Sequence, residues 1–96
     1  MIKGKLSNGY EIEVDERKAQ THRFVKLMGK ALSDDQKARL AANANLLSYL
    51  VGDEEEEKLM AYVEAQTGEE ATEAEMAVLT IEIVRMMNDA DETAKK

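Results

Sequence analysis

The chain has 96 residues and a formal net charge of −7, with 13 Lys and Arg against 20 Asp and Glu, and this length fits one domain. It has no Cys and one His, which excludes a disulfide framework, a thiolate metal site and the usual His-rich zinc site. The acidic charge argues against nucleic acid as the main partner, residues 40–52 are too short and polar for a membrane span, and no signal-peptide pattern opens the chain.

The first predicted element is a β-hairpin. Apolar and charged residues alternate with period two on both sides of Ser7-Asn8-Gly9. Only a three-residue loop keeps the apolar residues of both arms on one face, with Gly9 in the left-handed conformation. The expected pairs are Ile2 with Val14, Gly4 with Ile12 and Leu6 with Tyr10.

Two helices are expected next. The first covers about 16–32, with Asp15 as its N-cap and an apolar stripe at helical spacing. This stripe comprises Phe24, Leu27, Met28, Ala31 and Leu32. Ser33 to Gln36 has the pattern of a capping box that opens the second helix, and Gly52 ends it. The apolar stripe of this second helix comprises Leu40, Ala44, Leu47, Leu50 and Val51.

Two more helices follow. Asp53 with Glu56 predicts a capping box for a short third helix that ends near residues 67–68. Thr72 with Glu75 predicts another box for a fourth helix, over about 73–88. Apolar residues cover more than half of the circumference of the fourth helix. We therefore expect this helix to lie at the centre of the bundle or to be buried by another chain.

The expected fold is therefore mainly α, with an N-terminal β-hairpin followed by a small bundle of about four helices. Residues 1–88 are expected to form a single domain, with the hairpin in 1–14 and the bundle in 15–88. Residues 89–96 are expected to be a frayed tail.

No residue pattern indicates an enzyme. His22 has no Ser, Cys or acidic partner placed to form a catalytic relay, which favours a solvated surface histidine over a base or ligand. The acidic run 53–57 lacks the alternating pattern of a calcium loop and favours a solvated helix start, with a basic docking partner as the alternative. We expect no catalytic residue, cofactor or metal.

The methionines and the apolar fourth helix indicate a protein partner instead. Methionine fills gaps in cores but also makes adaptable binding surfaces, and Met86 and Met87 end a helix with surplus apolar surface. We expect the partner surface to combine this helix with the hairpin edge. Its candidate residues are Leu79, Ile83, Met86, Met87, Tyr10 and Ile12.

The order of features resembles a tail assembly chaperone of long-tailed (siphovirus-type) phages and prophages. The likeness extends over about residues 5–88. It depends on the spacing of hydrophobic residues and on one junction between a glycine and acidic residues, which lies within Leu46–Glu54. The other segments that carry the likeness are Gly9–Arg17, Arg23, Phe24 and Leu27, Leu59, and Thr72–Met87.

The resemblance implies a transient assembly factor without enzymatic activity. Such chaperones coat the long tape measure protein, keep its apolar helical surface soluble and recruit tail tube subunits. They act in the cytoplasm of the bacterial host, are absent from the mature virion and self-associate, so this chain would form a homo-oligomer.

Other functions remain open from the sequence. The charge concentrated in 53–57 and 69–75 is compatible with an acidic phage-encoded inhibitor or nucleic-acid mimic that binds a basic target. A regulatory helical domain that simply dimerises is the other alternative. Salt dependence separates an acidic mimic from an apolar binder, since only the mimic's binding weakens steeply with salt.

Overall fold

The computed structural model describes residues 1–94 and begins with the expected hairpin. Strands β1 (Ile2–Lys5) and β2 (Glu11–Val14) pair antiparallel, with Ile2 opposite Val14 and Gly4 opposite Ile12, which confirms the predicted register. The Leu6 and Tyr10 backbones are joined by a 2.8 Å hydrogen bond, and Gly9 has a φ of 95°. The three-residue loop is therefore confirmed as well.

The prediction of one continuous first helix is wrong, because the structure has two helices in this region. A 3₁₀ helix, η1 (Glu16–Gln20), is capped by Asp15 as expected, but it ends at Thr21, and a separate helix α1 spans His22–Ala31. Thr21 has extended dihedral angles, φ −84° and ψ 151°, and its hydroxyl accepts a hydrogen bond from the Phe24 amide at 3.2 Å. A β-branched residue that caps the following turn thus interrupts the helical pattern.

Helix α2 (Gln36–Val51) begins with a different cap from the one expected. Asp35, rather than Ser33, is the N-cap and accepts from the Lys37 amide at 3.0 Å. Gly52, with a φ of 87°, ends the helix as predicted. Leu40, Ala44 and Val51 of the predicted stripe are only half-buried, and the buried residues of this helix are Ala42, Leu46, Leu47 and Leu50.

Helix α3 (Asp53–Thr67) follows Gly52 directly, so the predicted capping box is wrong. Asp53 is already helical, and no side chain caps this N-terminus. Glu56 instead accepts a hydrogen bond from the Ser48 hydroxyl at 2.9 Å and so ties α3 to α2. The predicted end is confirmed, since Gly68 is left-handed with a φ of 76°.

Helix α4 (Glu73–Ala94) starts with the predicted box and ends later than predicted. The Thr72 hydroxyl accepts from the Glu75 amide, and the Glu75 carboxylate accepts from the Thr72 amide at 3.1 Å. The helix continues past Asn88 to Ala94, and residues 95–96 of the expected tail lie outside the described part. No helix within residues 1–94 is long and apolar enough to cross a bilayer.

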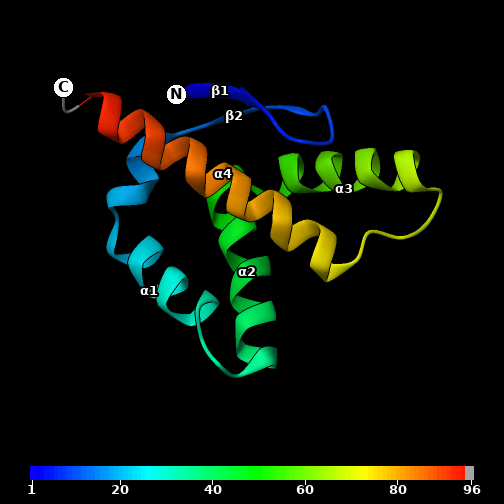
Figure 1. Cartoon of the computed structure of the whole chain (residues 1–96), viewed down its shortest axis with the longest axis horizontal. Coiled ribbons are helices and arrows are strands. Elements are labelled where there is room, and N and C mark those ends of the chain that lie inside the picture. Colours follow the sequence, from blue (N-terminus) through cyan, green and yellow to red (C-terminus); the bar gives the residue numbers. More distant parts are fainter. Residues whose placement is uncertain (95–96) are drawn as a thin grey trace.

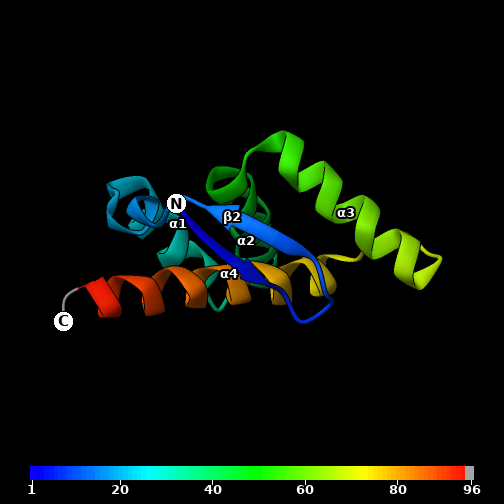
Figure 2. The same ribbon diagram turned by 90° about the horizontal axis from the view of Figure 1, so that it is seen from above.

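The helices form two layers, with α4 in front and α1, α2 and α3 behind it, and the hairpin covers them at one end (Figure 1). Helix α4 crosses in front of α2, α1 packs on α2, and α3 extends away from the end of α2. Seen from above, the hairpin lies across the helices, where β1 packs on α4 and β2 packs on α2 (Figure 2). The mainly α fold with an N-terminal hairpin is thus confirmed.

Candidate interaction surface

Most of the residues expected to bind a partner lie in the core of this chain. Leu79, Ile83, Met87 and Ile12 are at most 4% exposed. They pack together where the hairpin covers α4, so the surplus apolar surface of that helix is largely buried by the chain's own strands. A partner would reach these four side chains only if the hairpin separated from α4.

The fifth expected residue, Met86, packs against the hairpin. Its side chain crosses β1 over Gly4, where a built Cβ would lie 2.7 Å from the methionine Sδ. Only glycine leaves room for this approach. Met86 is therefore half-buried between strand and helix rather than projecting into solvent.

The sixth expected residue, Tyr10, joins the hairpin to α3. Its hydroxyl donates to the Glu55 carboxylate at 2.7 Å, and its ring meets Tyr62 edge to face at 5.2 Å. Burial, together with the hydrogen bond to Glu55, raises the pKa of Tyr10 to about 12. The hairpin loop is also fixed, since the Ser7 hydroxyl donates to Glu82 of α4 at 2.6 Å.

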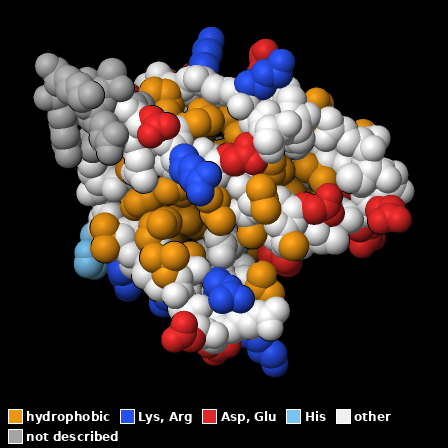
Figure 3. Space-filling model, in the orientation of Figure 1, with side chains coloured by type: hydrophobic (Ala, Val, Ile, Leu, Met, Phe, Trp, Pro, Cys, Tyr) orange, Lys and Arg blue, Asp and Glu red, His pale blue; other side chains and the backbone are white. Residues whose placement is uncertain are grey.

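An open apolar groove lies between α1, α2 and α4. It encloses about 490 Å³ and is continuous with the hydrophobic side chains that gather on this face in Figure 3. Its buried floor includes Ala31, Leu46 and Val84. We call this feature the apolar groove, and its lining residues are Met28, Ala31, Leu32, Arg39, Leu40, Asn43, Leu46, Ala77, Thr80, Ile81, Val84 and Arg85.

The rim of the apolar groove exposes large hydrophobic side chains. Leu32, just past the end of α1, is 76% exposed, and Ile81 of α4 is 48% exposed. The charged side chains in the lining, Arg39 and Arg85, are both cationic. The sequence predicted that Leu32 belongs to an apolar stripe, and its exposure was not expected. The surplus apolar surface of the fourth helix, in contrast, indicates that a residue such as Ile81 can be exposed.

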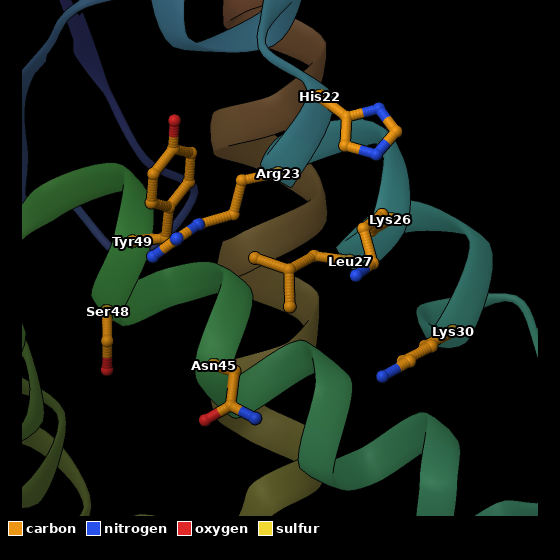
Figure 4. Close-up of a pocket in the computed structure, with 8 residues that line it drawn as sticks. All are labelled: His22, Arg23, Lys26, Leu27, Lys30, Asn45, Ser48 and Tyr49. Carbon is orange, nitrogen blue, oxygen red and sulfur yellow. The ribbon is translucent and has the colours of Figure 1, made fainter.

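A second groove, on the other side of α1, is basic. It lies between α1 and α2, encloses about 790 Å³ and is lined on α1 by Arg23, Lys26 and Lys30 (Figure 4). In this view the Arg23 side chain extends from α1 toward Tyr49, whereas the His22 ring points away from α2. His22 is exposed, as expected for a surface histidine.

The acidic run at the start of α3 divides into two sets. Glu55 and Glu56 turn toward the protein and accept from Tyr10 and Ser48. Asp53, Glu54 and Glu57 are exposed to solvent. Among the side chains that the structure describes, those of residues 1–89, no group of His, Asp or Glu is arranged to hold a metal ion.

Comparisons with known proteins leave the function to be argued from this geometry. No protein-family model, curated protein or solved structure matches the chain.

Proposed function

We propose that the chain is a non-enzymatic tail assembly chaperone of a long-tailed phage or prophage, acting in the host cytoplasm. In this proposal it binds helical segments of the tape measure protein, recruits tail tube subunits and self-associates. The observation that supports it is the apolar groove, whose rim leaves Leu32 and Ile81 exposed on an otherwise acidic protein. The proposed binding surface therefore differs from the one expected from the sequence: it lies on the neighbouring face of α4, beside the face that packs against the hairpin.

The shape and chemistry of the apolar groove suit a helix. Its walls are helices, and a partner helix would place an apolar stripe, at three- and four-residue spacing, between Leu32 and Ile81. Each large side chain transferred from water into such a site contributes about 1.5–3 kcal/mol. The cationic Arg39 and Arg85 favour acidic residues beside that stripe.

The test is co-expression of the full chain with the tape measure protein of the same phage or prophage. We expect a soluble complex that survives purification in high salt, because apolar contacts are not screened by ions. Leu32→Glu/Ile81→Glu should lose the complex while the protein keeps its fold, since both side chains are exposed.

Val25 supplies the matched control. It is 61% exposed on α1 but does not line the apolar groove, so Val25→Glu should bind as the wild type does. The proposal fails if the tape measure protein stays insoluble with the wild type, or if Val25→Glu and Leu32→Glu/Ile81→Glu weaken binding equally.

The exposed carboxylates of α3 favour a second candidate, an acidic inhibitor or nucleic-acid mimic. Asp53 and Glu57 form no ion pair among the described residues, so a basic target could contact them. That function predicts binding that weakens steeply as salt rises and that does not respond to substitutions in the apolar groove.

A further inference from the structure

Charge is unevenly distributed between two parts of the chain. Residues 16–51, which include α1 and α2, have seven Lys and Arg against three Asp and Glu, a net charge of +4. Residues 53–89, which include α3 and most of α4, have two Lys and Arg against twelve Asp and Glu, a net charge of −10. The overall charge of −7 therefore combines a basic part with a strongly acidic part.

The basic part contains a continuous cationic surface on α1. Arg23, Lys26 and Lys30 follow one another at i, i+3 and i+7, which places them on one face of α1 over about 10 Å. All three are exposed and line the basic groove, whose wall on α2 adds the polar Asn45, Ser48 and Tyr49 (Figure 4). None of the three cations forms an ion pair with another side chain of residues 1–89, the part whose side chains the structure describes.

The acidic part contains a matching surface. Asp53, Glu54 and Glu57 occupy positions i, i+1 and i+4 and share the outer face of the first turns of α3. Glu54 has Lys58 as a neighbour at 3.6 Å, and Asp53 and Glu57 have no cationic partner within the described residues. Glu55 and Glu56, engaged with Tyr10 and Ser48, hold this turn in place.

We propose that the basic groove of one copy binds the exposed carboxylates of α3 of a second copy. Three unpaired cations lie along about 10 Å of one face of α1, and three exposed carboxylates lie along about 6 Å of one face of α3, so the two surfaces carry complementary charges. This complementarity favours a second copy over nucleic acid, because an extended polyanion would also run past the acidic residues 53–89 and be repelled.

This contact uses neither the apolar groove nor the hairpin. It assigns the self-association of the proposed function to particular residues and in that respect rests on that function. It is separate from tape measure binding, so the two can fail independently in their tests. Since the two charged surfaces differ, each copy can bind one neighbour through its basic groove and another through its α3 carboxylates. Ion pairs at such an exposed interface fix orientation and weaken strongly with salt.

The experiment is a charge swap on the full-length protein, followed by sedimentation velocity. We expect the wild type to associate at about 50 mM NaCl and to associate at least about tenfold more weakly at about 500 mM. Lys26→Glu/Lys30→Glu and Glu54→Lys/Glu57→Lys should each be monomeric at low salt. An equimolar mixture of the two variants should associate again, because the mixture restores opposite charges at both kinds of contact.

The matched control is Glu69→Lys/Glu70→Lys, which changes the net charge by the same amount as Glu54→Lys/Glu57→Lys, at exposed positions after α3. This variant should associate like the wild type, and circular dichroism of all variants should show an unchanged fold. A monomeric wild type at low salt, a mixture that stays monomeric, or a control that dissociates equally would each overturn the proposal. Binding of a single-stranded oligonucleotide to a monomeric wild type, abolished by Lys26→Glu/Lys30→Glu, would assign the basic groove to nucleic acid and also overturn it.

Discussion

Single residues decide how closely the hairpin approaches α4. Gly4 lies in the middle of β1, opposite Ile12, where a larger residue would normally strengthen a strand. Its missing side chain is the space that Met86 fills. A glycine that lowers strand propensity is therefore used for packing between strand and helix.

Gly4→Ala should lower the free energy of unfolding by roughly 1–2 kcal/mol, because the added Cβ overlaps Met86 and forces its flexible end to move. Gly29→Ala is the control. A Cβ at Gly29 meets nothing within 4 Å, and this residue lies inside α1, so alanine should stabilise by about 0.5–1 kcal/mol. Urea unfolding midpoints measure both. Equal effects at the two glycines would show that Met86 does not restrict Gly4.

At the scale of elements, caps decide where the helices begin. Thr21 separates η1 from α1, and besides capping Phe24 its hydroxyl lies 2.8 Å from the Tyr49 hydroxyl of α2. Lys18 of η1 donates to the Tyr49 carbonyl at 2.7 Å. The junction between η1 and α1 is thus fastened to the end of α2.

Thr21→Ala should therefore cost about 1–2 kcal/mol, since it removes both an N-cap and a contact between helices. Thr72→Ala is the comparison, because Thr72 caps α4 within an exposed local box and its hydroxyl makes no hydrogen bond to another helix among the described residues. Its cost should be about 0.5–1 kcal/mol. Thermal unfolding followed at 222 nm tests the difference, and a larger loss for Thr72→Ala would contradict this role for Thr21.

These elements show what the sequence could and could not predict. Alternation around Ser7-Asn8-Gly9 determines the hairpin register, because a slip of one residue would turn every apolar side chain outward. Tertiary contacts support the break at Thr21 and the direct start of α3 after Gly52, since Thr21 contacts Tyr49 and Glu56 contacts Ser48, and local patterns do not contain these contacts.

The candidate site was harder to predict than the fold. An apolar helix signals that something covers it, but not whether the cover is another chain or the hairpin. The hairpin covers Ile83 and Met87, which leaves Ile81 on the next face and Leu32 across the groove. Helical periodicity had grouped Leu32 with buried residues such as Phe24, because the stripe continues past the point at which α1 ends.

At the scale of the whole molecule, the hairpin and the helices share one core. Leu6, Ile12 and Val14 of the hairpin belong to the same buried cluster as Ile83 and residues from every other main helix. A two-stranded hairpin is marginal alone, and α4 without its cover would expose Met87. Because the hairpin and the helices share this one cluster, folding should be cooperative.

We therefore expect one unfolding transition for the strands and the helices. In urea, the fluorescence of the three tyrosines, two of which form the Tyr10–Tyr62 contact, should change with the same midpoint as helical circular dichroism. Ile12→Ala should shift both midpoints together and cost about 2–4 kcal/mol, because Ile12 is only 3% exposed. If fluorescence changed first, the hairpin would open while the helices persist. Leu79, Ile83 and Met87 would then become accessible, and a partner could bind the α4 surface that the hairpin covers as well as the apolar groove.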